Sequence, residues 1–196
     1  MAIKNTLDKL FGSNIRVKLL KFLFRNYPVS LGAKELSKKI QESLIKTKRE
    51  LILLSNLGLI SKKRNKTLDC FLNPNFEFFG ELRNLILKSS PAEKDKMVKK
   101  ISGLGKVRLA VISGVFLNGN GLDLYETPAD LFIVGDDISK NRLRNFLASL
   151  EAEVGKEVKF SLMGKEEFQY RYGMFDRFIR VLLEGPHEKI INKLGL

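Results

Sequence analysis

Residues Leu31 to Asn73 read LGAKELSKKIQESLIKTKRELILLSNLGLISKKRNKTLDCFLN. Apolar residues at helical spacing predict a short amphipathic helix over Leu31–Ile40 and a longer one over Ser43–Leu57. After Gly58, a residue type suited to the left-handed position that ends a helix, alternating apolar residues predict a hairpin of two strands. The stretch therefore predicts two helices followed by a β-hairpin.

The longer helix is expected to bury one side and to expose cations on the other. Its buried stripe is predicted to consist of Leu44, Thr47, Leu51 and Leu54. The other side carries Ile45, Lys46, Lys48 and Arg49, with Ser43 as the expected N-cap. A helix that enters a major groove with its N-terminus first presents such residues to phosphates and base edges. The alternative is a solvated charged face.

The predicted hairpin favours the interpretation that the helix enters a major groove, because the tip of the hairpin is strongly basic. Its inward face would be Ile60, Leu68, Cys70 and Leu72, and the cations near the tip are Lys62, Lys63, Arg64 and Lys66. Folding a hairpin does not require four cations that repel one another, so a polyanionic partner is the simplest explanation. On the shorter helix, Lys34 and Lys38 are further candidates for phosphate contacts.

The charge of the chain is distributed unevenly. The net charge is +13, and residues 1–91 hold 18 Lys and Arg against 7 Asp and Glu, whereas residues 92–196 hold 17 against 15. Such asymmetry indicates that one half meets a nucleic acid or a membrane surface. No run of 18 apolar residues occurs, and the first residues lack the apolar stretch of a signal peptide. We therefore expect a cytoplasmic protein with no membrane partner.

Two single residues limit the chemistry that the chain can perform. Cys70 is the only cysteine and His187 the only histidine, so neither an intrachain disulfide nor a Cys/His zinc site can form within one chain. A surface position is expected for His187, because the sequence suggests no Ser or Cys partner for it.

The segment Asn118–Gly121 lacks the spacing of a phosphate-binding loop and is expected to form a turn. We expect no cofactor and no metal.

The N-terminal segment resembles the winged helix-turn-helix superfamily of bacterial and archaeal transcription regulators over residues 11–75. The phrase Asn56-Leu-Gly-Leu-Ile60 before a basic hairpin is typical of these regulators. The resemblance implies a helix in the major groove and a basic wing on the backbone or minor groove. Ile52 and Leu53 depart from the pattern, because polar residues are expected there. They would meet another helix, the second half of the chain or a second subunit.

A further helix is predicted over residues 76–88, with one broad apolar face. It could join the two halves of the chain or pair two subunits, and the family likeness implies a homodimer. Ser89-Ser-Pro91 is expected to end it. The expected domains are therefore a winged helix over residues 1–75, a connecting helix and linker over 76–91, and a second domain over 92–196.

Helical and strand patterns alternate in the C-terminal half. Helices are predicted over 93–104, 138–153, 164–173 and 176–183, and strands over 107–112, 130–134 and 157–163. This alternation predicts a sheet with helices packed against it, which gives the whole chain an α+β fold with a small α/β second domain.

The order of these elements resembles the nucleotidyltransferase fold of the polymerase-beta-like superfamily. That resemblance implies Gly-Ser after the first strand, paired acids at the start of the second and a third acid on a later strand, which together hold Mg²⁺ and a nucleotide. This chain has Ser113-Gly114 in the first place, only Asp130 in the second and Lys159 near the third. The three residues Ser113, Gly114 and Asp130 would be a vestigial nucleotide or metal site. Alternatively, Asp130 is a structural carboxylate bonded to nearby backbone.

The leading hypothesis is a transcription regulator that binds double-stranded DNA, with no catalytic residues and with the second domain as a sensor or oligomerisation module. One rival is an active nucleotidyltransferase that uses the winged helix to find its substrate. Another is a winged helix that binds protein through Ile45, Ile52 and Leu53.

Overall fold

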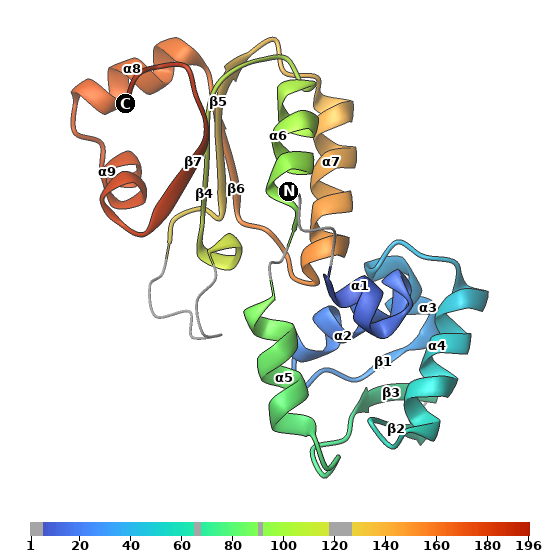
Figure 1. Ribbon diagram of the computed structural model, residues 1–196. Helices are drawn as coiled ribbons and strands as arrows, with labels where there is room; N and C mark the ends of the chain where they lie inside the picture. Colours follow the sequence, from blue (N-terminus) through green and yellow to red (C-terminus); the bar gives the residue numbers. More distant parts are fainter. Residues whose placement is uncertain (1–5, 65–67, 90–91, 118–126) are drawn as a thin grey trace. The chain divides into compact units, whose positions relative to one another are not determined.

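The computed structural model describes residues 6–64, 68–89, 92–117 and 127–196. The chain forms two compact units, which we call the first and the second unit. The first unit comprises residues 1–91 and 151–157, and the second comprises residues 92–150 and 158–196. Each unit combines helices with a small sheet, so the protein belongs to the mixed α+β class (Figure 1).

The first unit is built from short helices and a three-stranded sheet. Its elements are α1 (Thr6–Phe11), α2 (Asn14–Arg25), β1 (Leu31–Gly32), α3 (Ala33–Lys39), α4 (Leu44–Asn56), β2 (Ile60–Arg64), β3 (Leu68–Leu72) and α5 (Phe79–Lys88). The strands follow the order β1-β3-β2, and both pairings are antiparallel. The hairpin of β2 and β3 thus lies where the sequence predicted it, and its turn at 65–67 is outside the described residues.

Local capping explains where α2 begins and where α4 ends. The Ser13 side chain accepts a hydrogen bond from the Arg16 N–H at 3.2 Å, which caps α2. After α4, Gly58 has a φ of +78°, its N–H bonds to Ser55 O at 3.0 Å, and Leu59 N–H bonds to Leu54 O at 3.1 Å. These are the two hydrogen bonds of a Schellman motif, and they confirm the predicted role of Gly58.

The structure corrects the predicted start of two helices in this unit and adds a helix that was not predicted. Residues Leu31–Gly32 do not begin a helix but form β1, in which Leu31 pairs with Cys70 and Gly32 with Asp69. The apolar spacing of Leu31 fits a helix equally well, and only the distant partner strand shows the difference. Helix α1 was not predicted at all. The helix predicted over 76–88 begins at Phe79.

The core of the first unit joins the helices to one face of the sheet. Its fully buried side chains include Leu19, Leu20, Leu23, Leu36, Ile40, Leu54, Leu72 and Ile86. Ile86 belongs to α5, and the ring of Phe79 at the start of α5 lies 5.5 Å from both Phe24 and Tyr27. Helix α5 therefore packs as part of the first unit, against α2.

The second unit has a four-stranded sheet with helices on both faces. Its elements are α6 (Lys94–Ser102), β4 (Lys106–Ser113), a 3-10 turn (Gly114–Phe116), β5 (Leu131–Asp136), α7 (Lys140–Val154, which ends in the first unit), β6 (Phe160–Met163), α8 (Lys165–Gly173), α9 (Arg177–Glu184) and β7 (His187–Asn192). The strand order is β6-β5-β4-β7, with β5 and β6 parallel and the other pairs antiparallel. Strand β7 was not predicted.

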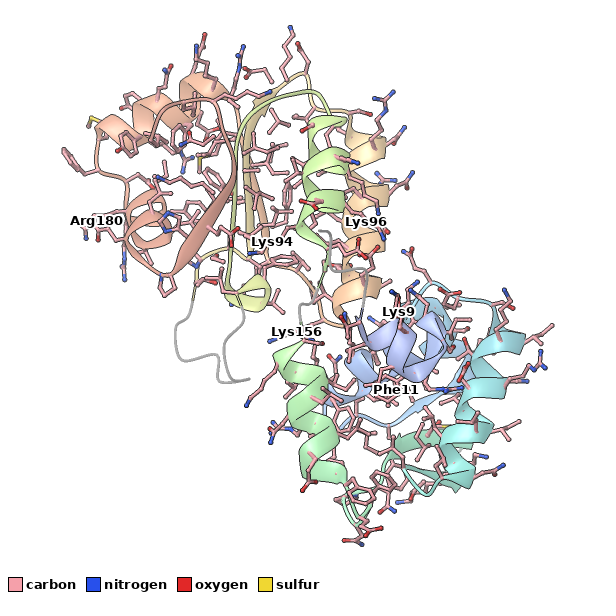
Figure 2. The ribbon with its side chains drawn as sticks, in the orientation of Figure 1. Lys9, Phe11, Lys94, Lys96, Lys156 and Arg180 are labelled. Atoms are coloured by element: carbon pink, nitrogen blue, oxygen red, sulfur yellow. The ribbon has the colours of Figure 1, made fainter. Side chains whose placement is uncertain are left out.

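Helices cover the central strands of this sheet on both sides, which explains the continuous apolar runs in β4 and β5. Helices α8 and α9 lie on one side, and α6 and the part of α7 in this unit lie on the other (Figure 1). Under α8 and α9 the core consists of Leu109, Val111, Phe132, Val134, Met163, Phe168, Ile179 and Leu182. Lys96 of α6 and Arg180 of α9 extend outward from their helices (Figure 2).

None of the described helices combines the length and the apolar character that a membrane crossing needs.

Candidate nucleic-acid interface and the Asp130 site

Helix α4 buries one face and exposes the other. Three of the four residues of the predicted stripe, Thr47, Leu51 and Leu54, are buried in the core of the first unit, whereas Leu44 is only partly buried. The exposed residues of the helix include Ile45, Lys46, Lys48, Arg49, Ile52 and Leu53. Ile52 is 52% exposed and Leu53 is 38% exposed, so the two apolar residues that depart from the family pattern are not buried within the first unit, and Ile45 is 73% exposed.

The one acidic residue of α4 turns toward α2 and away from the exposed cations. Glu50 Oε2 accepts from Arg16 Nε at 2.8 Å, and Glu50 Oε1 accepts from Ser13 Oγ at 2.6 Å. Arg16 in turn donates to the Phe11 carbonyl at 2.6 Å, which fixes the pair. The negative charge of Glu50 is thus neutralised at the junction of α2 and α4. The exposed face of α4 retains three cations and no acid, as an anion-binding surface requires.

The residues next to α4 that the sequence singled out are exposed. Ser43 occupies the N-cap position, but its side chain makes no capping hydrogen bond, so this part of the prediction was wrong. The backbone explains α4's first turn instead, because Thr47 N–H bonds to Ser43 O at 2.9 Å. Lys34 and Lys38 are exposed on α3.

In the hairpin, the two described lysines lie on opposite faces. Both Lys62 and Lys63 are exposed, and they pair across the ladder with Cys70 and Asp69 respectively. Successive residues of a strand point to opposite faces, so Lys62 lies at the edge of the core-facing side and Lys63 on the outer side. Burial raises the pKa of the Cys70 thiol, and the charge of Lys62 partly opposes this shift. The Arg64 side chain and Lys66 lie outside the described residues.

In the second unit, Asp130 just precedes β5 and is almost fully buried. Its Oδ1 accepts a hydrogen bond from Val115 N–H at 3.0 Å, and its Oδ2 accepts one from Lys159 N–H at 2.9 Å. Its backbone N–H bonds to Lys159 O at 2.7 Å. The carboxylate therefore ties the end of β4 and the start of β6 to the start of β5, which is the structural role weighed for it from the sequence.

Ser113 and Gly114 complete the same arrangement. Ser113 Oγ donates to Ala129 O, and Ser113 N–H bonds to Asp130 O at 2.8 Å. Gly114 has a φ of +50°, and a Cβ at this position would lie 2.1 Å from Asp130 Oδ1. Glycine is thus required both by the left-handed backbone and by the close approach of the carboxylate. The structure brings together the three residues that the sequence grouped.

Metal-ligating residues do not gather in the described ranges, where no cluster of three or more His, Cys, Asp or Glu side chains could hold an ion. His187 is half-buried at the start of β7, and its Nδ1 lies 2.9 Å from Gly185 O. Asn118–Gly121, predicted to form a turn, falls outside the described residues.

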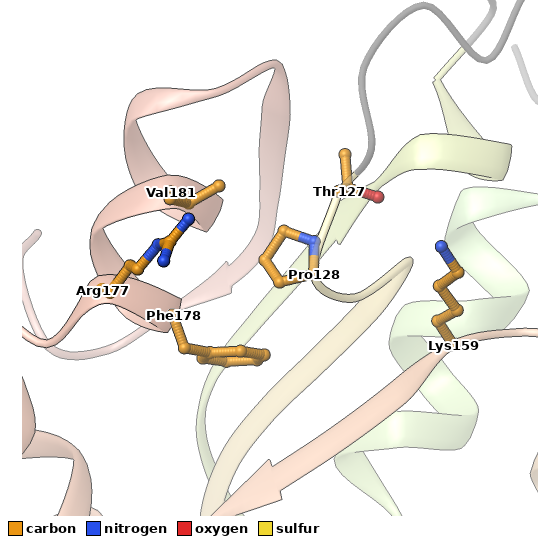
Figure 3. Close-up of a pocket in the computed structure, with 6 residues that line it drawn as sticks. All are labelled: Thr127, Pro128, Lys159, Arg177, Phe178 and Val181. Carbon is orange, nitrogen blue, oxygen red and sulfur yellow. The ribbon is translucent and has the colours of Figure 1, made fainter.

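A pocket of about 580 Å³ opens beside the Asp130 arrangement (Figure 3). It is lined by Thr127, Pro128, Lys159, Arg177, Phe178 and Val181. In the sequence, Lys159 is distinguished only as a departure from the nucleotidyltransferase pattern, and nothing there points to Arg177 or Phe178. Neither residue carries a motif, and they share a pocket with Lys159 only because α9 lies near the starts of β5 and β6.

Comparisons with protein-family models, with curated protein sequences and with solved structures found no match for this chain. Any functional assignment must therefore depend on the geometry of these sites.

Proposed function

We propose that the first unit is a winged helix-turn-helix module that binds double-stranded DNA, and that the protein is a transcription regulator. The order α2, β1, α3, α4, β2, β3 with the antiparallel sheet β1-β3-β2 supports this proposal, because it places a hairpin directly after the second helix of a helix-turn-helix pair. The observation that carries the proposal is the exposed face of α4, where Lys46, Lys48 and Arg49 stand without an acid.

In this proposal, α4 enters the major groove with its N-terminal turns. Arg49 is suited to bind guanine, because its planar guanidinium can donate two parallel hydrogen bonds. Ile45 is suited to the methyl group of thymine, which offers an apolar contact in the same groove. Ser43, Lys34, Lys38 and the hairpin cations Lys62, Lys63, Arg64 and Lys66 would contact the phosphate backbone. These contacts would set the orientation of the module on the duplex.

The proposal predicts a strong dependence of affinity on salt. If four to six phosphates are neutralised, log K falls with log salt with a slope of roughly −4 to −5. Fluorescence anisotropy of a labelled duplex, titrated with the protein from about 50 to about 300 mM salt, measures this slope. A slope near zero for a duplex that binds would contradict phosphate contacts as the source of affinity.

A non-catalytic role of the second unit, as a sensor or oligomerisation module, completes the proposal. It is supported by the hydrogen bonds of Asp130, because each of its two carboxylate oxygens already accepts a backbone N–H. Incubation with Mg²⁺ and labelled ATP tests the rival hypothesis of an active nucleotidyltransferase. Nucleotidyl transfer that Asp130→Ala abolishes would overturn this part of the proposal.

One observation favours a second function for the same face of α4, namely binding of protein. Ile45, Ile52 and Leu53 are exposed by 73%, 52% and 38%, which is more apolar surface than a purely phosphate-binding helix needs. Light scattering of the wild type and of Ile52→Lys distinguishes the two functions. A protein interface between copies of the chain predicts a change of mass in the variant, whereas an unchanged mass together with an unchanged DNA affinity removes the support for it.

A further inference from the structure

The turn between α8 and α9 exposes four apolar side chains, which we call the turn cluster: Tyr170, Tyr172, Met174 and Phe175. The turn lies at the edge of the second unit, away from its sheet (Figure 1). The exposed fractions of the four side chains are 70%, 48%, 66% and 80%, in chain order. Together they expose roughly 500 Å² of largely apolar surface, and a patch of that size on a protein surface marks a binding site.

Folding of the second unit does not explain the phenylalanine at position 175. Phe175 has a φ of +53° and follows α8 at the position where Gly58 follows α4. Its N–H bonds to Tyr172 O at 3.2 Å, and Asp176 N–H bonds to Arg171 O at 3.0 Å, which are the two hydrogen bonds of a Schellman motif. Glycine is favoured at this position, and a bulky residue is strained there. A contact outside the chain is therefore the simplest reason for an exposed ring at this position.

The turn cluster is held in place before any partner binds. Asp176 caps α9, because its side chain accepts two backbone N–H groups at 2.9 and 3.3 Å. Arg171 forms ion pairs with Glu167 at 2.7 Å and with Asp176 at 4.0 Å, which connect α8 to the start of α9. The ring of Tyr172 stacks on the buried Phe168 ring, with centroids 5.7 Å apart. Such a fixed surface loses little conformational entropy when it binds.

The charges around the turn cluster are complementary to a second copy of the same surface. Residues 165–184 contain four Lys and Arg and four Asp and Glu, although the whole chain has a net charge of +13. A neutral surface does not attract a polyanion such as a nucleic acid or an anionic membrane. The exposed charged residues of α8 are Glu166 and Glu167, and those of α9 are Arg177, Arg180 and Glu184. A two-fold axis at the turn places the acidic α8 of each copy against the basic α9 of the other.

We propose that the turn cluster is a homodimer interface, in which α8 and α9 pack against the same helices of a second copy. Burial of the turn cluster in both copies removes about 1,000 Å² from water, which is the area at which biological interfaces begin. The proposal specifies the oligomerisation role proposed above for the second unit, and it rests on that role. DNA binding by α4 is measured separately, so either proposal can fail without the other.

Sedimentation velocity of the full chain from about 1 to about 100 μM tests the interface, and the wild type should approach twice the mass of one chain. Phe175→Asn should raise the dissociation constant of the dimer by about 100-fold or more, because each dimer loses two aromatic anchors. Met174→Lys should also weaken the dimer, because it places a charge in the apolar centre. Asparagine tolerates a left-handed backbone, so the urea midpoint of Phe175→Asn in dilute, monomeric solution should be unchanged or higher.

Ile52→Lys is the matched control, because it adds a charge to an exposed apolar residue of α4, outside the turn cluster. It should leave the dimer unchanged. A wild type with the mass of one chain at every concentration would overturn the proposal, as would a dimer that Ile52→Lys abolishes. A dimer that Phe175→Asn leaves intact would reject this surface and retain the oligomerisation role.

Two other results would assign the turn cluster differently and so contradict the proposal. A lower urea midpoint for Phe175→Asn in dilute solution would show that the ring supports the fold of the second unit. Without a dimer, binding of the wild type but not of Phe175→Asn to phosphatidylcholine vesicles or to a single-stranded oligonucleotide would assign the cluster to lipid or to stacked bases.

Discussion

Replacing Gly114 with alanine should destabilise the second unit more than a left-handed backbone alone explains. The new Cβ would lie 2.1 Å from Asp130 Oδ1 and 2.8 Å from Thr127 Oγ1, well inside ordinary contact distances. The carboxylate must move, and its hydrogen bond from Val115 N–H at 3.0 Å is then lost. Loss of a hydrogen bond to a charged group costs about 1.5–3 kcal/mol, and a non-glycine residue at positive φ costs roughly 1–2 kcal/mol.

The expected loss of unfolding free energy for Gly114→Ala is therefore about 2.5–5 kcal/mol. Urea denaturation followed by far-UV circular dichroism measures it, and the midpoint should fall by about 1 M or more. Gly195→Ala is the control, because Gly195 has a φ of +73° and a Cβ there meets nothing within 4 Å. Gly195→Ala should lower the unfolding free energy only by the cost of a non-glycine residue at positive φ, about 1–2 kcal/mol. If the two variants lose equal stability, the close packing of Gly114 on Asp130 is refuted.

Two further predictions concern the first unit. Thr47 is fully buried in α4, and its hydroxyl has no hydrogen-bond partner among the described residues, so Thr47→Val should raise the unfolding free energy by about 1 kcal/mol in the same urea titration. A loss of stability would instead show that the hydroxyl is satisfied. Because burial raises the pKa of Cys70, the sole thiol should react with a disulfide reagent much more slowly in the folded protein than in urea, and its pH midpoint should lie above that of the unfolded chain. The contribution of this shift to stability is fully present below the thiol pKa of the unfolded chain and is lost as pH rises through the folded pKa. Equal reactivity in both states would contradict the burial.

Where signals in the sequence are local, the predictions agreed with the structure. The buried stripe of α4, the left-handed Gly58 and the hairpin of β2 and β3 depend on residues a few positions apart, and each lies where the pattern indicated. The approximate positions of α6, α7, α8 and α9 followed from the same kind of periodicity.

The two missed strands share a physical cause, because each is defined by a partner strand far away in the chain. Strand β1 has only two residues and forms by pairing with β3, and β7 is recognisable only by its ladder with β4. The capping prediction for α4 went wrong for another reason. Ser43 occupies the N-cap position, but its side chain makes no hydrogen bond to the first turn of the helix.

For the candidate sites as well, features set by neighbouring residues were predictable and features set by distant contacts were not. The cations of α4 and their exposure could be predicted from helical periodicity, whereas the withdrawal of Glu50 to Arg16 required the packing of α2 on α4. Ser113, Gly114 and Asp130 were grouped only through a family resemblance, which suggested a vestigial site. Their hydrogen bonds show a clamp between strands. Nothing in the sequence connected Arg177 and Phe178 with Lys159, because three separate elements form the pocket.

The proposal that α4 binds DNA can be tested with two charge-matched variants in one anisotropy experiment. One variant replaces Lys46, Lys48 and Arg49 of α4 with alanine, and the other replaces the exposed cations Lys140, Arg144 and Lys193 of the second unit. Both remove three positive charges, and circular dichroism checks that both fold. We predict that the α4 variant loses about 100-fold or more in affinity for a labelled duplex, with a salt slope shallower by about 2 to 3, while the second-unit variant binds like the wild type. Equal losses in the two variants would contradict the proposal, because the affinity would then follow the net charge and not the exposed face of α4.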